Sequence, residues 1–225
     1  MERLLQSVRI GINEKIFVKD PESSELGKRI VEHGIVMIDE MGFESFTFKK
    51  LGTKIGSNES SIYRYFENKH KLLVYLTSWY WGWREYQLVF ATNSMQDPIE
   101  KLKTAIAVLT KAVETDSSFS HIDEVALNRI VINESSKSFL TKEVDEENRQ
   151  GYFNIYQRLV TRLTEMIQAV DSNYPYPSSL ASTILEGNLH QNFLKDHFPK
   201  LTNCDGKNPS SAFITDMVFK VLNND

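Results

Sequence analysis

The side chains best suited to chemistry in this sequence lie in the short segment NESSIYRYF, residues 58–66. Ile62 and Phe66 stand four residues apart, so in a helix both face the core. Short hydroxyls allow a helix backbone to approach a duplex closely, and an arginine can donate paired hydrogen bonds to a guanine edge. The 3.6-residue period therefore predicts an outward face suited to the major groove of DNA, formed by Ser60, Ser61, Arg64 and Tyr65.

The residues around this face fit the same chemistry. Thr47 and Lys69 stand at the expected starts of the helices before and after it, where a hydroxyl, a cation and free backbone N–H groups suit phosphate. Asn58 is the natural N-cap of the segment. Glu59 has two interpretations that the sequence leaves equal: it accepts a hydrogen bond from a cytosine amino group, or it caps the N-terminus of its own helix.

The charge distribution agrees with a local anionic partner. The whole chain has a net charge of −4, yet residues 45–75 hold six basic and two acidic side chains. A basic island in an acidic chain indicates one anionic contact surface, although charge alone equally fits a solvated lysine-rich helix face. The six basic residues are Lys49, Lys50, Lys54, Arg64, Lys69 and Lys71.

Four helices must position these side chains. A first helix is expected from Asp20-Pro21, with its apolar stripe running to Met41 and Gly42 ending it. Thr47 caps a short second helix that ends at Gly56, and Asn58 caps the third. A fourth helix starts after Asn68 and runs to about residue 90. The tight glycine-bearing turn between the second and third helices predicts a helix-turn-helix unit.

Helical patterns continue through the rest of the chain. Helices are expected from Asp97-Pro98, around 121–135, over 143–171, over 178–195 and over 209–222. Ten glycines and six prolines are few for a protein of 225 residues, and alternation typical of a strand appears only near residues 16–18. The sequence therefore predicts an all-α fold.

One stretch of this sequence resembles the DNA-binding domain of TetR-family transcriptional regulators. It runs from Gly42-Phe43 through Thr47-Phe48-Lys49-Lys50-Leu51 and Ile55-Gly56-Ser57-Asn58 to Ser61-Ile62-Tyr63-Arg64-Tyr65-Phe66-Glu67-Asn68-Lys69. Gly52 and Ser57 depart from the pattern, which usually has alanine and an apolar residue there. The resemblance implies an N-terminal extension over 1–22, a helix-turn-helix domain over 23–73 and a larger helical ligand-binding and dimerisation domain over 74–225.

The resemblance also implies a function and residue roles. It implies a homodimeric regulator, expected to be a repressor, which binds a palindromic operator and is released by a small-molecule effector. In this family pattern, phosphates are held by Thr47, Lys49, Tyr63 and Lys69. The residues that would face bases are Glu59, Ser60, Ser61, Arg64 and Tyr65, with Asn58 beside them.

The larger domain has two expected surfaces, each with a plainer alternative. The helices over 178–195 and 209–222 would form the dimer interface, although their apolar faces equally fit packing inside one chain. Aromatic residues at helical spacing would line the effector pocket or simply fill the core. These ligand-binding candidates are Trp79, Trp83, Tyr86, Phe90, Tyr152 and Tyr156.

Other classes of function lack support in the sequence. It has no Gly-rich phosphate loop, no G-x-S-x-G and no HExxH, so we expect no enzyme and no cofactor. A metal site at His121, Asp123 and His190 is a weak alternative. One cysteine, no apolar run of membrane-spanning length and no secretory signal predict a cytoplasmic protein.

Two questions stay open at this stage. Residues 1–19 fit either a basic arm that reaches a DNA groove or a packed flap. A protein-interaction module that has this fold without operator specificity is the alternative function, and the cations of the basic island argue against it.

Overall fold

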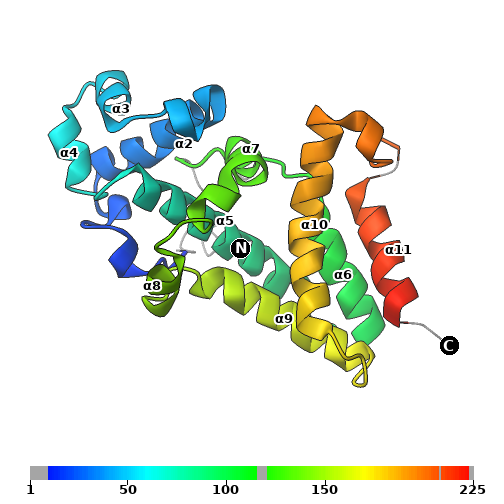
Figure 1. Cartoon of the computed structure of the whole chain (residues 1–225). Coiled ribbons are helices and arrows are strands. Elements are labelled where there is room, and N and C mark those ends of the chain that lie inside the picture. Colours follow the sequence, from blue (N-terminus) through cyan, green and yellow to red (C-terminus); the bar gives the residue numbers. More distant parts are fainter. Residues whose placement is uncertain (1–9, 116–120, 208, 223–225) are drawn as a thin grey trace. The chain divides into compact units, whose positions relative to one another are not determined.

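The computed structural model describes residues 10–115, 121–207 and 209–222, and it confirms the all-α prediction (Figure 1). Within the described residues every regular element is helical. The apolar run at 16–18, where a strand was conceivable, instead follows a 3₁₀ turn over Glu14–Ile16. Arg3 and Arg9 of the expected basic arm, and the whole of the Ser-rich break at 117–120, lie outside the described residues.

Contacts divide the chain into two compact units. Unit one comprises the described residues up to Gly82 together with Val113–Ile155, and unit two comprises Trp83–Ala112 together with the described residues from Tyr156 onward. The sequence predicts a different division, into a DNA-binding domain that ends at residue 73 and a ligand-binding and dimerisation domain after it. That division by function stays a prediction.

Unit one contains the helix-turn-helix. Its helices are α2 (Glu25–Ser45), α3 (Phe48–Lys54), α4 (Glu59–Tyr63), the first part of α5 (Lys69–Thr92), α7 (Glu124–Glu134) and α8 (Val144–Arg149), with 3₁₀ turns at Pro21–Ser23 and Ser135–Ser138. The buried side chains between these helices form its core, including Ile30, Ile35, Phe46, Leu51 and Leu72.

The start of the first helix differs from the prediction. Asp20 caps only the 3₁₀ turn, by accepting a hydrogen bond from the Glu22 amide at 2.9 Å, and α2 begins at Glu25 behind the N-cap Ser24. Gly27 allows this tight corner, because a Cβ there would overlap the backbone of Pro21.

The expected single helix over 143–171 is wrong. The structure has two helices there, α8 and α9 (Asn154–Val170), because Gly151 between them has a φ of 82°. Glycine adopts this left-handed conformation without the steric cost that other residues meet, so the chain turns at this point.

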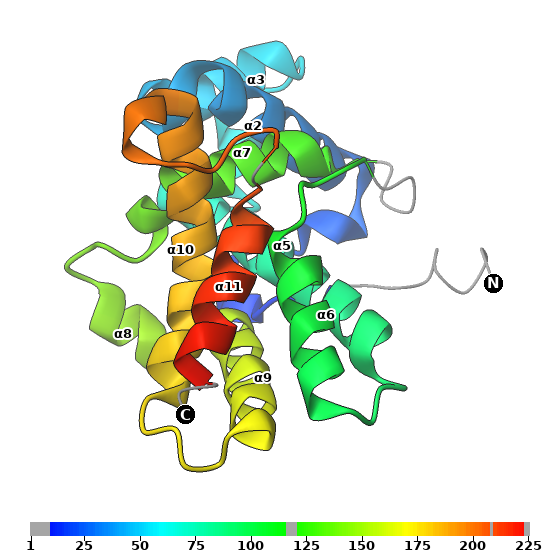
Figure 2. The same cartoon turned by 90° about the vertical axis from the view of Figure 1, so that its right-hand side faces the viewer.

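Unit two is a helical bundle. It contains the end of α5, α6 (Pro98–Thr110), most of α9, α10 (Pro177–His197) and α11 (Ser210–Leu222), with a 3₁₀ turn over Pro199–Leu201. Helices α6, α10 and α11 lie side by side (Figures 1 and 2). Among the helices that the structure describes, none is long and apolar enough to cross a membrane.

Candidate nucleic-acid interface

The turn of the helix-turn-helix depends on two glycines. Gly56 has a φ of 62°, and a Cβ on Gly52 would lie 3.0 Å from the Ser57 carbonyl oxygen. The Ser57 amide also donates to the Gly52 carbonyl at 2.8 Å. The absence of a side chain at Gly52 therefore lets α3 meet the start of α4 closely, which explains the departure from alanine at this position.

The two helices are fixed from beneath by apolar side chains and from the side by an arginine. Leu51, Ile62 and Phe66 are fully buried, and Ile55 is nearly so. Arg29 on α2 donates a hydrogen bond to the Ile55 carbonyl at the end of α3. Since α4 has only five residues, this packing and not intrinsic helix stability must hold its exposed face in place.

The cap of α4 is Asn58, as the sequence predicts. Its Oδ1 accepts hydrogen bonds from the Ser61 amide at 2.8 Å and from the Ser61 hydroxyl at 2.7 Å. The alternative in which Glu59 caps its own helix is therefore wrong. The Glu59 carboxylate instead accepts a hydrogen bond from the Tyr63 hydroxyl at 3.3 Å. Thr47 caps α3 in the predicted way, accepting from the Lys50 amide at 3.2 Å.

Tyr63 stands on the outer face with its ring supported from α3. Its side chain is 46% exposed, and its ring meets that of Phe48 edge-on at a centroid distance of 5.1 Å. Partial burial and the Glu59 carboxylate both raise the pKa of Tyr63. The hydroxyl thus stays a neutral hydrogen-bond donor at physiological pH, but it gives its one proton to Glu59. A phosphate contact by Tyr63 stays a prediction that requires this hydrogen bond to break.

Three cations on this face are exposed and have no hydrogen bond or ion pair within the described residues. They are Lys49 and Lys54 on α3 and Arg64 at the end of α4. Ser60 is exposed beside them. Lys54 is absent from the contacts predicted from the sequence, although the basic island included it. Its place in the last turn of α3 makes it a further candidate for a phosphate contact.

Tyr65, predicted to face bases, is buried instead. Only 4% of it is exposed, and its hydroxyl lies 2.7 Å from that of Ser24. The helix ends at Tyr63, and the amides of Tyr65 and Phe66 both donate to the Ile62 carbonyl. The prediction that Tyr65 faces outward is therefore wrong, because the helical period applies only as far as Tyr63, the last residue of α4.

Lys69 also serves the fold and not the outer face. Its ammonium donates to the carbonyls of Phe43, Glu44 and Phe46 at 2.9, 3.0 and 3.2 Å. An ammonium has three donors, so all of them are occupied. The predicted phosphate contact by this side chain is thus inconsistent with the structure.

Residues 10–19 pack against other parts of unit one, as the flap interpretation expects. Ile16 is buried, the Val18 amide donates to the Tyr65 carbonyl at 2.8 Å, and Phe17 contacts Tyr75 edge-on. Lys19 lies over the Tyr65 ring at 5.1 Å. These contacts support the buried side of the domain behind α4.

The six aromatic ligand candidates are divided between the two units. Trp79 and Tyr152 are buried in unit one, and the Tyr152 hydroxyl donates to the Lys15 carbonyl at 3.1 Å. Trp83 is buried in unit two, while Phe90 is 70% exposed and stacks on Tyr86. Burial and the Glu186 carboxylate, 2.7 Å from its hydroxyl, raise the pKa of Tyr156 in unit two.

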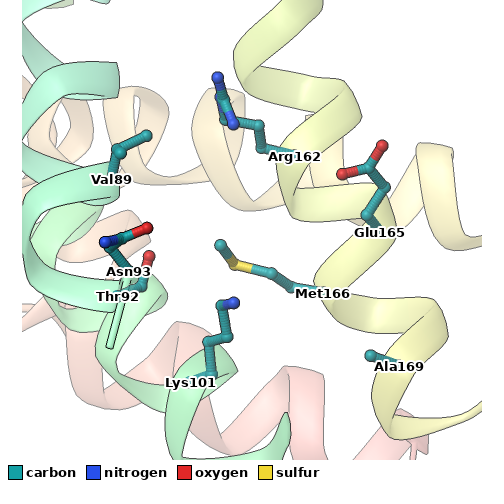
Figure 3. Close-up of a pocket in the computed structure, with 8 residues that line it drawn as sticks. All are labelled: Val89, Thr92, Asn93, Lys101, Arg162, Glu165, Met166 and Ala169. Carbon is teal, nitrogen blue, oxygen red and sulfur yellow. The ribbon is translucent and has the colours of Figure 1, made fainter. Parts of the chain in front are cut away.

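Unit two contains a pocket of about 220 Å³ between α5, α6 and α9 (Figure 3). The side chains of Asn93, Lys101 and Met166 point into it, and Arg162 and Val89 stand at its upper end in the view of Figure 3. The pocket combines apolar walls with an amide, two cationic groups and the Glu165 carboxylate, which suits a small polar molecule. None of the six aromatic candidates lines this pocket.

One wall of the pocket is anchored by an ion-pair network. Glu85 is 5% exposed and accepts hydrogen bonds from Arg158 at 2.6 and 2.5 Å and from Arg162 at 2.7 Å. Burial by itself would raise the pKa of Glu85, but the hydrogen bonds and charges of the two arginines outweigh it, so the pKa is lowered. The network ties α9 to α5 within unit two.

Within the described part of the chain, no three His, Cys, Asp or Glu residues are grouped in a way that could hold a metal ion. His121 of the weak metal alternative pairs with Glu22 at 2.7 Å. Cys204 is buried and carries a free thiol.

The last two helices are only partly covered within the chain. Ile214, Val218 and Leu222 of α11 are buried against its neighbours, whereas Phe213 is 47% exposed. Phe198 and Leu201, between α10 and α11, are 52% and 69% exposed. Intrachain packing thus accounts for one face of α11 and leaves apolar surface at its start.

Residues 30–76 match the sequence profile described as bacterial regulatory proteins of the tetR family. No curated protein sequence matches the chain. Solved structures with a similar fold include AibR in complex with isovaleryl coenzyme A and operator DNA, at 18% identity and a TM-score of 0.57, covering 86% of this chain and 97% of that one.

Two further structures resemble the chain. The fatty acid degradation regulator FadR from Bacillus halodurans is 16% identical, with a TM-score of 0.57 and coverages of 87% and 93%. The superantigen PfiT is 14% identical, with a TM-score of 0.60 and coverages of 92% and 100%. At these identities the likeness shows a shared fold.

Proposed function

We infer that the protein binds a specific DNA operator and regulates transcription, because residues 30–76 match the TetR-family profile and the chain shares the fold of AibR and FadR. The observation that carries this inference is the exposed surface of α3 and α4. Lys49, Lys54 and Arg64 all stand there, and their side chains have no hydrogen-bond or ion-pair partner in the described part of the chain; the exposed Ser60 lies beside them. Recognition of a duplex needs a helix that can enter the major groove and exposed cations that can contact phosphates and base edges.

The roles divide by side chain. Arg64 and Ser60 reach base edges, and Glu59, held by Tyr63, accepts from a cytosine amino group beside them. Lys49 and Lys54 contact phosphates, joined by the Thr47 hydroxyl at the start of α3. Asn58 and Ser61 act on DNA through the helix start that they stabilise.

Operator binding is expected from a homodimer. Two helix-turn-helix units related by a twofold axis read a palindrome whose half-sites are about one helical turn apart, roughly 34–36 Å. The partly exposed apolar start of α11, with Phe198, Leu201 and Phe213, is the surface through which a second copy would pack, together with α10.

A small molecule is expected to control the complex, with repression relieved when it binds. The structure of AibR contains isovaleryl coenzyme A, and FadR bears the name of a fatty acid degradation regulator. Acyl-coenzyme A esters and their free acids are therefore the first compounds to screen as effectors of this chain. The pocket at Asn93 and Lys101 and the aromatic candidates Trp83 and Tyr156 are the places to look for them.

Selection of duplexes from a random DNA pool tests the proposed function. The full chain at moderate salt should enrich a palindrome, and a variant carrying both Lys49→Ala and Arg64→Ala should not. Sedimentation of the protein with the enriched duplex should give two chains per site. Salt-sensitive binding without sequence preference would reject operator recognition and favour the protein-interaction module.

A further inference from the structure

The last turn of α2 is separated from the rest of that helix at Gly42. Its φ of 76° and ψ of 154° interrupt the helical hydrogen-bond pattern, and a new turn begins with the Phe46 amide donating to the Gly42 carbonyl at 3.2 Å. Thr47, the N-cap of α3, follows directly. The turn over residues 43–46 is therefore the joint that leads from α2 into the helix-turn-helix.

Side chains from other elements hold both ends of this joint. The amide of Phe43 at its start donates to the Glu134 carboxylate of α7 at 3.0 Å, and α7 lies beside α2 (Figures 1 and 2). The carbonyls at its end accept from the Lys69 ammonium. A carboxylate at the amide end of a helical turn and an ammonium at its carbonyl end both match the turn's dipole.

Glu134 is itself fixed in place. Its side chain is 12% exposed, and its second oxygen lies 2.7 Å from the Lys137 ammonium, which also approaches Glu44 at 3.2 Å. The hydrogen bond to Glu134 raises the pKa of Lys137, so this ammonium stays charged. Further along α2, Arg129 makes two-pronged hydrogen bonds to Asp39 at 2.9 and 2.6 Å. Residues of the segment 129–137 thus contact the C-terminal part of α2 at Asp39, Phe43 and Glu44.

We propose that Glu134 is a positioning residue for DNA binding: it fixes the joint before the helix-turn-helix on α7, so that a displacement of α7 changes the affinity for the operator. This role rests on the proposed function. The physical reason is that the non-helical backbone at Gly42 takes the Phe43 amide out of the helical hydrogen-bond pattern. Without Glu134, this half-buried amide would have to become exposed to water or remain an unpaired donor.

The test compares three variants of the full chain with the wild type. Glu134→Ala removes the acceptor, and Glu134→Gln keeps a carbonyl oxygen but loses the charge that Lys137 pairs with. Glu143→Ala is the matched control, because this carboxylate, before α8 in the same unit, is exposed and makes no capping hydrogen bond. Two quantities are measured: mass-spectrometric hydrogen exchange of peptides covering residues 42–47, and the Kd for the duplex that the wild type selects.

Glu134→Ala should accelerate exchange of the joint about tenfold and raise the Kd about three- to tenfold. Glu134→Gln should lie between it and the wild type, and Glu143→Ala should change neither quantity. Unchanged exchange in Glu134→Ala would overturn the contact, and faster exchange with a wild-type Kd would overturn the role in DNA binding.

Two outcomes need separate treatment. If Glu134→Ala does not fold, Glu134→Gln decides, and a wild-type Kd for that variant would overturn the proposal. If the wild type selects no duplex, the proposed function and the role of Glu134 in DNA binding fall together. The exchange measurement then still shows whether the contact itself exists, so the two failures are distinguishable.

Discussion

The hydroxyl of Tyr65 lies 2.7 Å from the hydroxyl of Ser24, the residue that caps α2 through the Gly27 amide. The contact joins the segment just after α4 to the start of α2, 41 residues earlier in the chain. It fixes Tyr65 in the core behind α4, away from the outer face that carries Arg64.

Tyr65→Phe tests this position. Loss of one hydrogen bond in a partly buried site should lower the free energy of unfolding by about 1 kcal/mol. The base preference of the selected duplex should not change, because the ring stays in place. Urea unfolding gives the first quantity and a competition assay with variant duplexes the second. A changed base preference would mean that the side chain does reach DNA.

Arg64→Ala should reduce discrimination at one base step by about 1–3 kcal/mol. The free energy of unfolding should stay close to that of the wild type, because Arg64 is exposed and has no partner within the described residues. Binding to every single-base variant of the selected duplex measures the effect. An equal loss for all duplexes would assign Arg64 to phosphate instead of a base.

Lys49→Ala should weaken binding to all duplexes alike and reduce the slope of log K against log salt by about one per half-site. Lys103→Ala is the matched control, since this exposed lysine lies on α6 in unit two and pairs with Glu100. The control should leave both the Kd and the salt slope unchanged. A salt slope in Lys49→Ala equal to that of the wild type would exclude a phosphate contact.

Lys69→Met should lower the free energy of unfolding by about 1.5–3 kcal/mol, because charge-assisted hydrogen bonds to three carbonyls are lost while the aliphatic stem is kept. At temperatures where the variant is folded, its salt slope for DNA binding should match that of the wild type. Thermal unfolding and duplex titration at several salt concentrations check the two statements. A reduced salt slope with normal stability would restore Lys69 as a phosphate contact.

Glu85→Gln should destabilise the protein by about 1–3 kcal/mol at pH 7, since the buried carboxylate accepts from two arginines. The folded-state pKa of Glu85 is lowered, so its contribution is fully present above the unfolded pKa of about 4.3 and is lost as the pH falls through the folded value. The difference in stability between the wild type and the variant should therefore narrow as the pH falls below the unfolded pKa. Urea unfolding between pH 3 and pH 7 measures the difference, and a constant gap would contradict the assignment.

The helix-turn-helix could be predicted closely from the sequence because its signals are local. Thr47 and Asn58 cap their helices as expected, and Gly56 takes the left-handed turn. Each of these features depends on hydrogen bonds within three residues or on the conformational freedom of one glycine. The same reasoning failed at Gly151, because a single glycine is tolerated inside a helix and its residue type alone gave no sign that the helix would break there.

The candidate site was predicted less completely. The outward placement of Ser60 and Arg64 follows from the period of α4, and the structure agrees that both are exposed. Tyr65 was placed by the same period although it lies beyond the last helical residue, where the period no longer applies. Lys69 was placed by its position at a helix start, which does not say where a flexible side chain with three donors will find its acceptors.

By itself the sequence determined most of the helices, the caps Thr47 and Asn58, the basic island and the outward face of α4, because all of these follow from interactions between near neighbours in the chain. Only the tertiary structure decided which polar groups serve the fold: Tyr65 with Ser24, Lys69 with the joint at residues 43–46, and Glu134 with the Phe43 amide. These partners lie 23 to 91 residues apart. Such contacts form when the packing of whole helices brings the groups together, and no local period encodes that packing.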